Sequence, residues 1–248
     1  MPSSGRAARS SAIAGAIACT LASAFTATAV GAPSCPEPLA SARRLVLVTA
    51  DGMTTSLARM QLYERAASTQ PWQPTGAPRP ARIGRNSMAW SPAFRSLARP
   101  SERTKSDGDL RVPAGIFKIG ESFGFAASPR PGYRQIAKGT VCVDDPESAA
   151  YNTITTRDKL GGFVRAEDMS SPAYRNGLTV EYPASRRAHA GSCLFIHVRP
   201  AGGGGTVGGV ALAEADVVAL QDFAEAGAVL AVLPESAIER LAGCLPGM

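Results

Sequence analysis

Glycine and proline interrupt this chain at short intervals, which limits it to short elements joined by many turns. Its 248 residues include 25 glycines and 19 prolines, and only 6% are aromatic. Leu178, Val180 and Tyr182 alternate with polar residues, the pattern of a half-buried strand. Other segments with strand character are residues 45–48, 83–90, 114–119, 192–198 and 229–233, whereas residues 66–81 and 91–109 are expected to form loops.

A helix is expected over residues 214–226. Acidic residues lie in its first turn, apolar residues share one face, and Gly227 follows its end. The chain is 45% hydrophobic, which is enough for a folded core. We therefore expect an α+β domain over residues 44–248, mainly β with a few helices, preceded by an N-terminal tail at residues 30–43.

Residues 1–29 have the features of an export signal. Arg6 and Arg9 precede an apolar stretch from Ala12 to about Phe25, and the small residues of 27–29 form a cleavage site. A membrane anchor is the alternative interpretation, but the stretch is short and rich in Ala and Thr. The sequence thus predicts a periplasmic or secreted protein with no transmembrane anchor after cleavage.

Export changes the interpretation of the cysteines, because an even number in an oxidising compartment favours disulfides. Four remain after cleavage: Cys35, Cys142, Cys193 and Cys244. Three connectivities are possible. Cys35 and Cys244 lie near the two chain ends, so a bridge between them, leaving Cys142 with Cys193, is the attractive pairing.

His197 lies on the strand predicted at 192–198, directly before a glycine-rich loop. Glycines let a turn bend tightly and expose amide N–H groups, which stabilise an oxyanion, while an imidazole accepts a proton from a nucleophile. The alternative is a hydrogen-bonded core histidine beside a flexible loop. A dinucleotide-binding interpretation of Gly203, Gly205 and Gly208 is rejected, since no room remains for the βαβ units that must follow.

Several segments, in order along the chain, resemble those of one family. They are Ile83 to Trp90, Lys105 to Asp109, Pro113 to Phe117, Cys142 to Pro146, Glu167 to Met169 with Tyr174, and Gly191 to Val198. Together they resemble the L,D-transpeptidase catalytic domain family of the YkuD type, in its exported bacterial branch. The resemblance implies a β-sandwich or barrel that joins peptidoglycan stem peptides by acyl transfer through a cysteine thioester, without a cofactor.

The resemblance fails at the decisive position. In the family a Ser/Thr-x-Gly-Cys turn carries the nucleophilic cysteine, and a histidine on the preceding strand is its base. Thr206, Gly208 and His197 match this pattern, but Gly209 stands where the cysteine belongs. Loss of the nucleophile from such a unit lowers the rate by about 10⁶. We therefore expect impaired transfer, or a non-catalytic protein that binds stem peptides or a partner murein synthase.

Three explanations of Gly209 stay open: a natural pseudoenzyme, an altered active enzyme, or an enzyme with a relocated nucleophile. Arg85, Asn86 and Arg199 are candidates for substrate binding. Two histidines without ligand spacing predict no metal site. The net charge of +6 is moderate and scattered, and no nucleic-acid motif is present.

Overall fold

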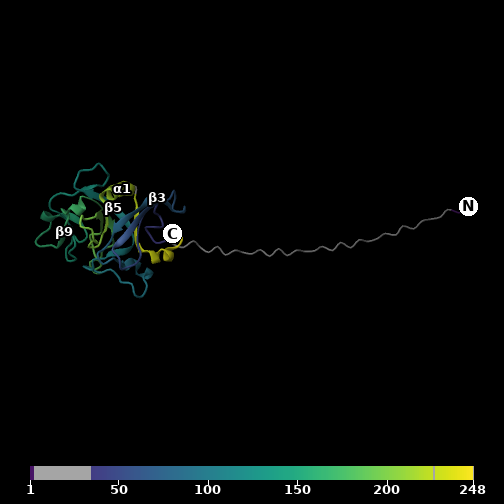
Figure 1. Cartoon of the computed structure of the whole chain (residues 1–248), viewed down its shortest axis with the longest axis horizontal. Helices are drawn as coiled ribbons and strands as arrows, with labels where there is room; N and C mark the ends of the chain where they lie inside the picture. The colour runs from purple at the N-terminus through teal and green to yellow at the C-terminus, as the bar shows by residue number, and fades with distance from the viewer. Residues whose placement is uncertain (3–34, 226, 248) are drawn as a thin grey trace. The chain divides into compact units, whose positions relative to one another are not determined.

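The computed structural model describes residues 1–2, 35–225 and 227–247 (Figure 1). The expected export signal at 1–29 therefore lies outside the described residues, except for its first two. The described chain is dominated by strands: β1 (Arg44–Ala50), β2 (Leu57–Glu64), β3 (Gln73–Arg82), β4 (Met88–Trp90), β5 (Val112–Gly124), β6 (Arg134–Gln135), β7 (Thr140–Val143), β8 (Ile154–Thr156), β9 (Ala166–Asp168), β10 (Asn176–Glu181), β11 (Phe195–Val198), β12 (Val210–Leu212) and β13 (Val229–Pro234).

Helices are few and short. The α-helix, α1, spans Glu214–Ala224 and carries Glu214 and Asp216 in its first turn, as the sequence predicted. Short 3₁₀ helices lie at Pro92–Leu97, Arg157–Lys159, Pro172–Tyr174, Glu235–Ala237 and Glu239–Leu241. The expected mainly β fold with a few helices is confirmed.

Ten strands form one large sheet that closes on itself. Its order is β10-β11-β12-β3-β2-β1-β13-β5-β4, with β6 beside β5. Closure comes from β5, which pairs with β13 on one edge and with β10 on the other. The apolar run predicted at 45–48 becomes β1, which pairs in parallel with β13 from Leu45↔Val229 onward. All six residues of β13 are buried, so both faces of the sheet are covered at this strand.

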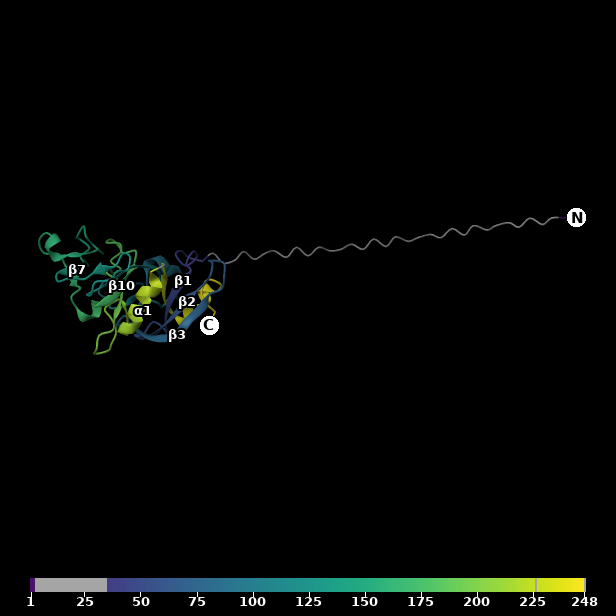
Figure 2. The same ribbon diagram turned by 90° about the horizontal axis from the view of Figure 1, so that it is seen from above.

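A second, three-stranded sheet of order β8-β7-β9 lies at one end of the domain. Figures 1 and 2 show β9 and β7 at the end opposite the C-terminus. Its core is small and borrows aromatic residues from the large sheet; the cluster consists of Phe123, Ile136, Cys142, Met169, Tyr174 and Phe195. We call residues 140–168, which contain these three strands, the lobe.

Three segments differ from the sequence prediction. The strand expected at 192–198 begins only at Phe195, because Cys193 has a φ of 53° that no strand residue adopts. The loop expected at 66–81 contains most of β3, despite prolines at 74, 78 and 80. Proline is tolerated there because β3 is largely exposed and meets β12 only at Ala211↔Arg82, so most of its second edge needs no amide donors. The strand expected at 83–90 is limited to β4, since residues 84–87 form a turn in which Ser87 has a φ of 73°.

Two disulfides tie the domain together, with the pairing that the cysteine positions favoured. Cys35–Cys244 spans 209 residues with a Cα–Cα distance of 5.4 Å, and Cys142–Cys193 spans 51 residues with a distance of 6.0 Å. Beside the first bridge, Leu39 is fully buried in the main core, so residues 35–43 pack onto the domain. Both bridges fit a chain that folds in an oxidising compartment. Within the described residues, no helix is long and apolar enough to cross a membrane.

Candidate functional site

His197 occupies the third position of β11, where the residue is only 8% exposed. Its Nδ1 lies 3.0 Å from the carbonyl oxygen of Val198. Because a carbonyl only accepts, Nδ1 carries the ring hydrogen and Nε2 presents a lone pair. Burial lowers the pKa of His197, which favours this neutral form. The imidazole therefore has the tautomer that a general base requires.

The loop after β11 is shaped by Thr206. Its hydroxyl donates to the carbonyl oxygen of Gly209 at 2.7 Å and accepts from the amide of Gly208 at 3.1 Å. Its backbone pairs with the segment before β4, since its amide donates to Ile83 and its carbonyl accepts from Arg85. Thr206 thus stabilises the turn through hydrogen bonds, and its hydroxyl hydrogen is already donated to Gly209.

Gly209 lies directly against the imidazole. A Cβ atom built on Gly209 would be 3.4 Å from Nε2 and 3.2 Å from Cδ2 of His197. The same Cβ would be 2.5 Å from the carbonyl oxygen of Phe195, which is closer than a real Cβ approaches a backbone atom. The turn and β11 are therefore packed together at a spacing that only glycine fits.

These residues form one wall of a cleft of about 680 Å³. His197, Gly208 and Gly209 line it, together with charged groups from both sides. Thr206 supports this wall from behind and is not among the lining residues. The charged residues that line the cleft are Lys105, Asp107, Asp144, Arg165 and Glu167.

The three expected substrate-binding residues do not line the cleft. Arg85 and Asn86 are exposed, and the Asn86 amide donates to the backbone carbonyl of Asp109. Arg199 follows β11 with a half-buried side chain, and its backbone amide donates to Leu212. The structure thus brings His197, Gly208 and Gly209 together and leaves Arg85, Asn86 and Arg199 outside.

Two residues that the chemical reasoning from sequence did not select, the half-buried Glu167 and the buried Tyr174, line the cleft. The Tyr174 ring packs edge-on against His197, with centroids 5.6 Å apart, and its hydroxyl donates to the carboxylate of Glu167. Burial, followed by the nearby charge of Asp144, raises the pKa of Glu167, while the Tyr174 hydrogen bond opposes the rise. Burial also raises the pKa of Tyr174, so its hydroxyl stays protonated. Their one signal in the sequence was membership of a segment resembling the family.

The opposite rim of the cleft is built from two loops. Lys105 forms a buried ion pair with Asp109 at 2.7 Å, and Asp107 accepts a hydrogen bond from the amide of Gly191 at 2.6 Å. Asp107 also lies 3.5 Å from Nδ1 of His189, whose side chain is otherwise exposed. The contacts of Asp107 with Gly191 and His189 thus hold the segment before β11 against the loop that precedes β5.

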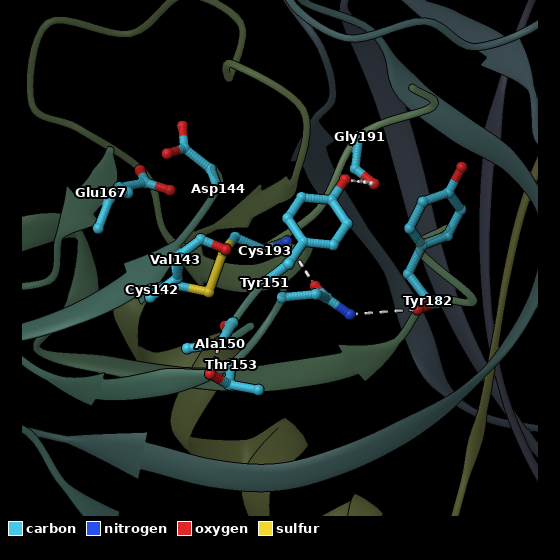
Figure 3. Close-up of a disulfide and its surroundings, with 12 residues drawn as sticks. Cys142, Val143, Asp144, Ala150, Tyr151, Thr153, Glu167, Tyr182, Gly191 and Cys193 are labelled. Atoms are coloured by element: carbon cyan, nitrogen blue, oxygen red, sulfur yellow. Dashed lines mark hydrogen bonds between the residues drawn. A yellow bond between two sulfur atoms is a disulfide. The ribbon is translucent and has the colours of Figure 1, made fainter. Parts of the chain in front are cut away.

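The Cys142–Cys193 bridge joins this segment to the lobe (Figure 3). Cys193 lines the cleft and its amide donates to Asn152 Oδ1 at 2.8 Å, while the Tyr151 hydroxyl donates to Gly191 at 3.3 Å. Cys193 is therefore unavailable as a replacement nucleophile. No group of three metal-ligating side chains is found in the described part of the chain.

Neither a protein-family model nor a curated protein matches this chain. Among solved structures, it is similar to the helical cell shape determining protein Pgp2 from Campylobacter jejuni, at 13% sequence identity and a TM-score of 0.39. The match covers 80% of this chain and 52% of that protein, so this chain spans about half of its length.

Proposed function

We propose that this protein is an exported cell-wall protein of the L,D-transpeptidase type that binds peptidoglycan stem peptides and performs no acyl transfer. The observation that carries the proposal is the contact between His197 and Gly209. A neutral imidazole places its Nε2 3.4 Å from where a Cβ of residue 209 would stand, at the position where the family pattern requires a thiol, and both residues line a cleft.

The cleft has the size and chemistry for a peptide. Its volume of about 680 Å³ lies within the usual range for small-ligand sites. Glycine backbone at 208 and 209 permits close approach of a peptide, and charged groups stand on both sides of the cleft. A charged, branched stem peptide fits this mixture better than an apolar ligand does.

The other side chains that could act as nucleophiles near the cleft are already bonded to other groups, which supports the absence of acyl transfer. Cys142 and Cys193 are bonded to each other, and the Thr206 hydroxyl already donates to Gly209. With its partner missing, His197 has no thiol to deprotonate, and a loss of about 10⁶ in rate is expected.

The close packing around Gly209 favours a natural non-catalytic binding protein over an active enzyme that was altered only at this residue. Any side chain at 209 would collide with the Phe195 carbonyl, so the spacing of β11 and the turn matches the glycine. An enzyme altered at this residue alone would keep room for the missing side chain. The two disulfides support a location outside the cytoplasm, in the periplasm or secreted.

The test combines turnover and binding on the full chain. Incubation with muropeptide tetrapeptides should release no D-alanine, whereas calorimetric titration with the same tetrapeptides should show saturable binding. Release of D-alanine that a thiol reagent blocks would contradict the non-catalytic assignment. Absence of binding would contradict the stem-peptide assignment.

A further inference from the structure

A second cavity, of about 490 Å³, lies at the other end of the strands from the cleft, and the described residues that line it differ from those of the cleft. The strand register places Arg44, Glu64 and Gln73 side by side, at the start of β1, the end of β2 and the start of β3. The opposite end of β3 meets β12, which begins directly after Gly209. We call this cavity the arginine pocket; its lining residues are Arg43, Arg44, Glu64, Arg65, Ala66, Gln73 and Gly227.

Arg65 is held in this pocket by neutral groups. Its Nε and Nη2 groups donate to the backbone carbonyls of residues 39, 40 and 42, at 2.8, 2.9 and 2.6 Å. Its guanidinium carbon lies 4.1 Å from the centre of the Trp72 ring, and the Trp72 indole donates to the carbonyl of Cys244. Burial lowers the pKa of Arg65, and in the described ranges no carboxylate forms an ion pair with it. The guanidinium is therefore fixed in place with its charge only partly compensated.

Arg44 and Arg43 add two further cations. Arg44 pairs through Nε with Glu64 at 3.0 Å and donates through Nη1 to the carbonyl of Phe223 at 2.8 Å, so that its Nη2 faces no acceptor in the part of the chain that the structure describes. Arg43 is exposed, and its side chain has no polar partner among the described residues. Of the described residues that line the pocket, Glu64 is the one carboxylate. Three guanidinium groups thus face one carboxylate, which leaves a surplus of two positive charges.

We propose that the arginine pocket binds a phosphate monoester group of a ligand, at a site separate from the cleft. A phosphate monoester carries a charge of about −2 at pH 7 and three strong acceptor oxygens, which match the surplus charge and the open guanidinium N–H groups. A guanidinium fork also fits a carboxylate, but a carboxylate would neutralise only one of the two surplus charges. The proposal does not depend on the function proposed for the cleft.

The first arm of the test titrates the ¹⁵N-labelled full chain with glycerol 3-phosphate at constant ionic strength, with acetate as the singly charged control. The indole signal of Trp72 and the amide signals of residues 43–44 and 65–66 should shift and reach saturation. Acetate should bind at least about tenfold more weakly, because it offers fewer charge-assisted hydrogen bonds. Absence of these shifts, or equal affinities for the two anions, overturns the proposal.

Three variants locate the binding. Arg43→Gln removes a side chain without a structural contact, so the fold should persist while glycerol 3-phosphate binds about tenfold more weakly, the lower end for hydrogen bonds to a charged group. Glu64→Gln removes the opposing charge and should bind about two- to fivefold more tightly. Arg95→Gln removes an exposed arginine outside the pocket and should leave the affinity unchanged. Equal losses in Arg43→Gln and Arg95→Gln would reduce the binding to attraction by net charge and overturn the pocket.

The last arm separates a lipid headgroup from a soluble ester. Phosphatidic acid presents a phosphate monoester on a membrane, so co-sedimentation is measured with vesicles of phosphatidylcholine containing phosphatidic acid. Sedimentation that Arg43→Gln weakens and that excess glycerol 3-phosphate competes away supports the pocket with a lipid as its ligand. Binding of glycerol 3-phosphate without sedimentation supports the pocket with a soluble ester. Absence of binding in both arms overturns it.

Discussion

The closed sheet and the lobe are stabilised in different ways. In the closed sheet, β1 and β13 lie side by side at the centre of a continuous apolar core, and every residue of β13 is buried. In the lobe, all three residues of β8 are only partly buried, and the small cluster includes Phe123 and Phe195 from the large sheet. The central strand β7 of the lobe is fully buried, but the lobe shares its small apolar cluster with the large sheet and is tied to that sheet by a disulfide.

This difference divides the cleft into two parts. His197 and Gly209 lie on or beside strands of the closed sheet, so their contact is set by the main core. Asp144, Arg165 and Glu167 come from the lobe, where fewer apolar contacts hold the backbone. Substitutions at the residues that the lobe contributes to the cleft are therefore expected to leave the position of the imidazole unchanged.

Loss of the terminal disulfide should have the largest effect on stability. Replacing Cys35 and Cys244 by Ala opens a loop of 209 residues, for which the chain-entropy relation gives about 5 kcal/mol of unfolding free energy. Chemical denaturation should show one cooperative transition at a much lower midpoint, since the bridge joins the ends of the main domain. An unchanged midpoint would mean that the bridge contributes nothing to the closed sheet.

Loss of the second disulfide should act locally. Replacing Cys142 and Cys193 by Ala opens a loop of 51 residues, with about 4 kcal/mol expected from the same relation. Because the lobe has little core of its own, hydrogen exchange should accelerate in β7 while β1 and β13 keep their protection. Equal acceleration in β13 would show that the lobe and the closed sheet unfold as one unit.

Alanine substitutions at the adjacent Gly208 and Gly209 should differ in their effect on the unfolding free energy, by less than loss of a disulfide. Gly209→Ala should lower the unfolding free energy by about 1–3 kcal/mol, because its Cβ meets the Phe195 carbonyl at 2.5 Å. Gly208→Ala is the matched control, since its Cβ would have an ordinary contact of 3.6 Å with the Arg111 carbonyl. Thermal unfolding of both variants decides the matter, and equal stability would refute the glycine-specific spacing. Gly209→Cys should suffer the same collision and release no D-alanine.

The pH dependence at Glu167 should be the smallest effect. A raised folded-state pKa means that the group contributes most stability below its ordinary value of 4.5 and loses that contribution as the pH rises through the folded value. Glu167→Gln has no such charge to bury, so its unfolding free energy should increase relative to the native protein from pH 4 to pH 7. Glu147→Gln serves as the exposed control. A difference that stays constant with pH would contradict burial of the Glu167 charge.

Local patterns were enough to predict several elements because their side chains repeat with the period of the element. The apolar run at 45–48, the alternation at 178–182 and the acidic start of the helix at 214 all correspond to β1, β10 and α1. The proline-rich β3 escaped prediction because its prolines are acceptable only on an edge that is mostly unpaired, and edges are set by neighbouring strands.

The sequence by itself determined the mainly β class and the positions of Cys35, Cys142, Cys193 and Cys244, and it places a histidine strand before a turn with Gly209 where the family pattern has cysteine. These are properties of short segments, and local chemistry decides them. Only the tertiary structure decided that a Cβ atom at position 209 would meet both His197 and the Phe195 carbonyl, and that Glu167 lines the same cleft. Closure of the sheet and the position of the lobe bring residues 167, 174 and 197 together, and no local pattern specifies such distant contacts.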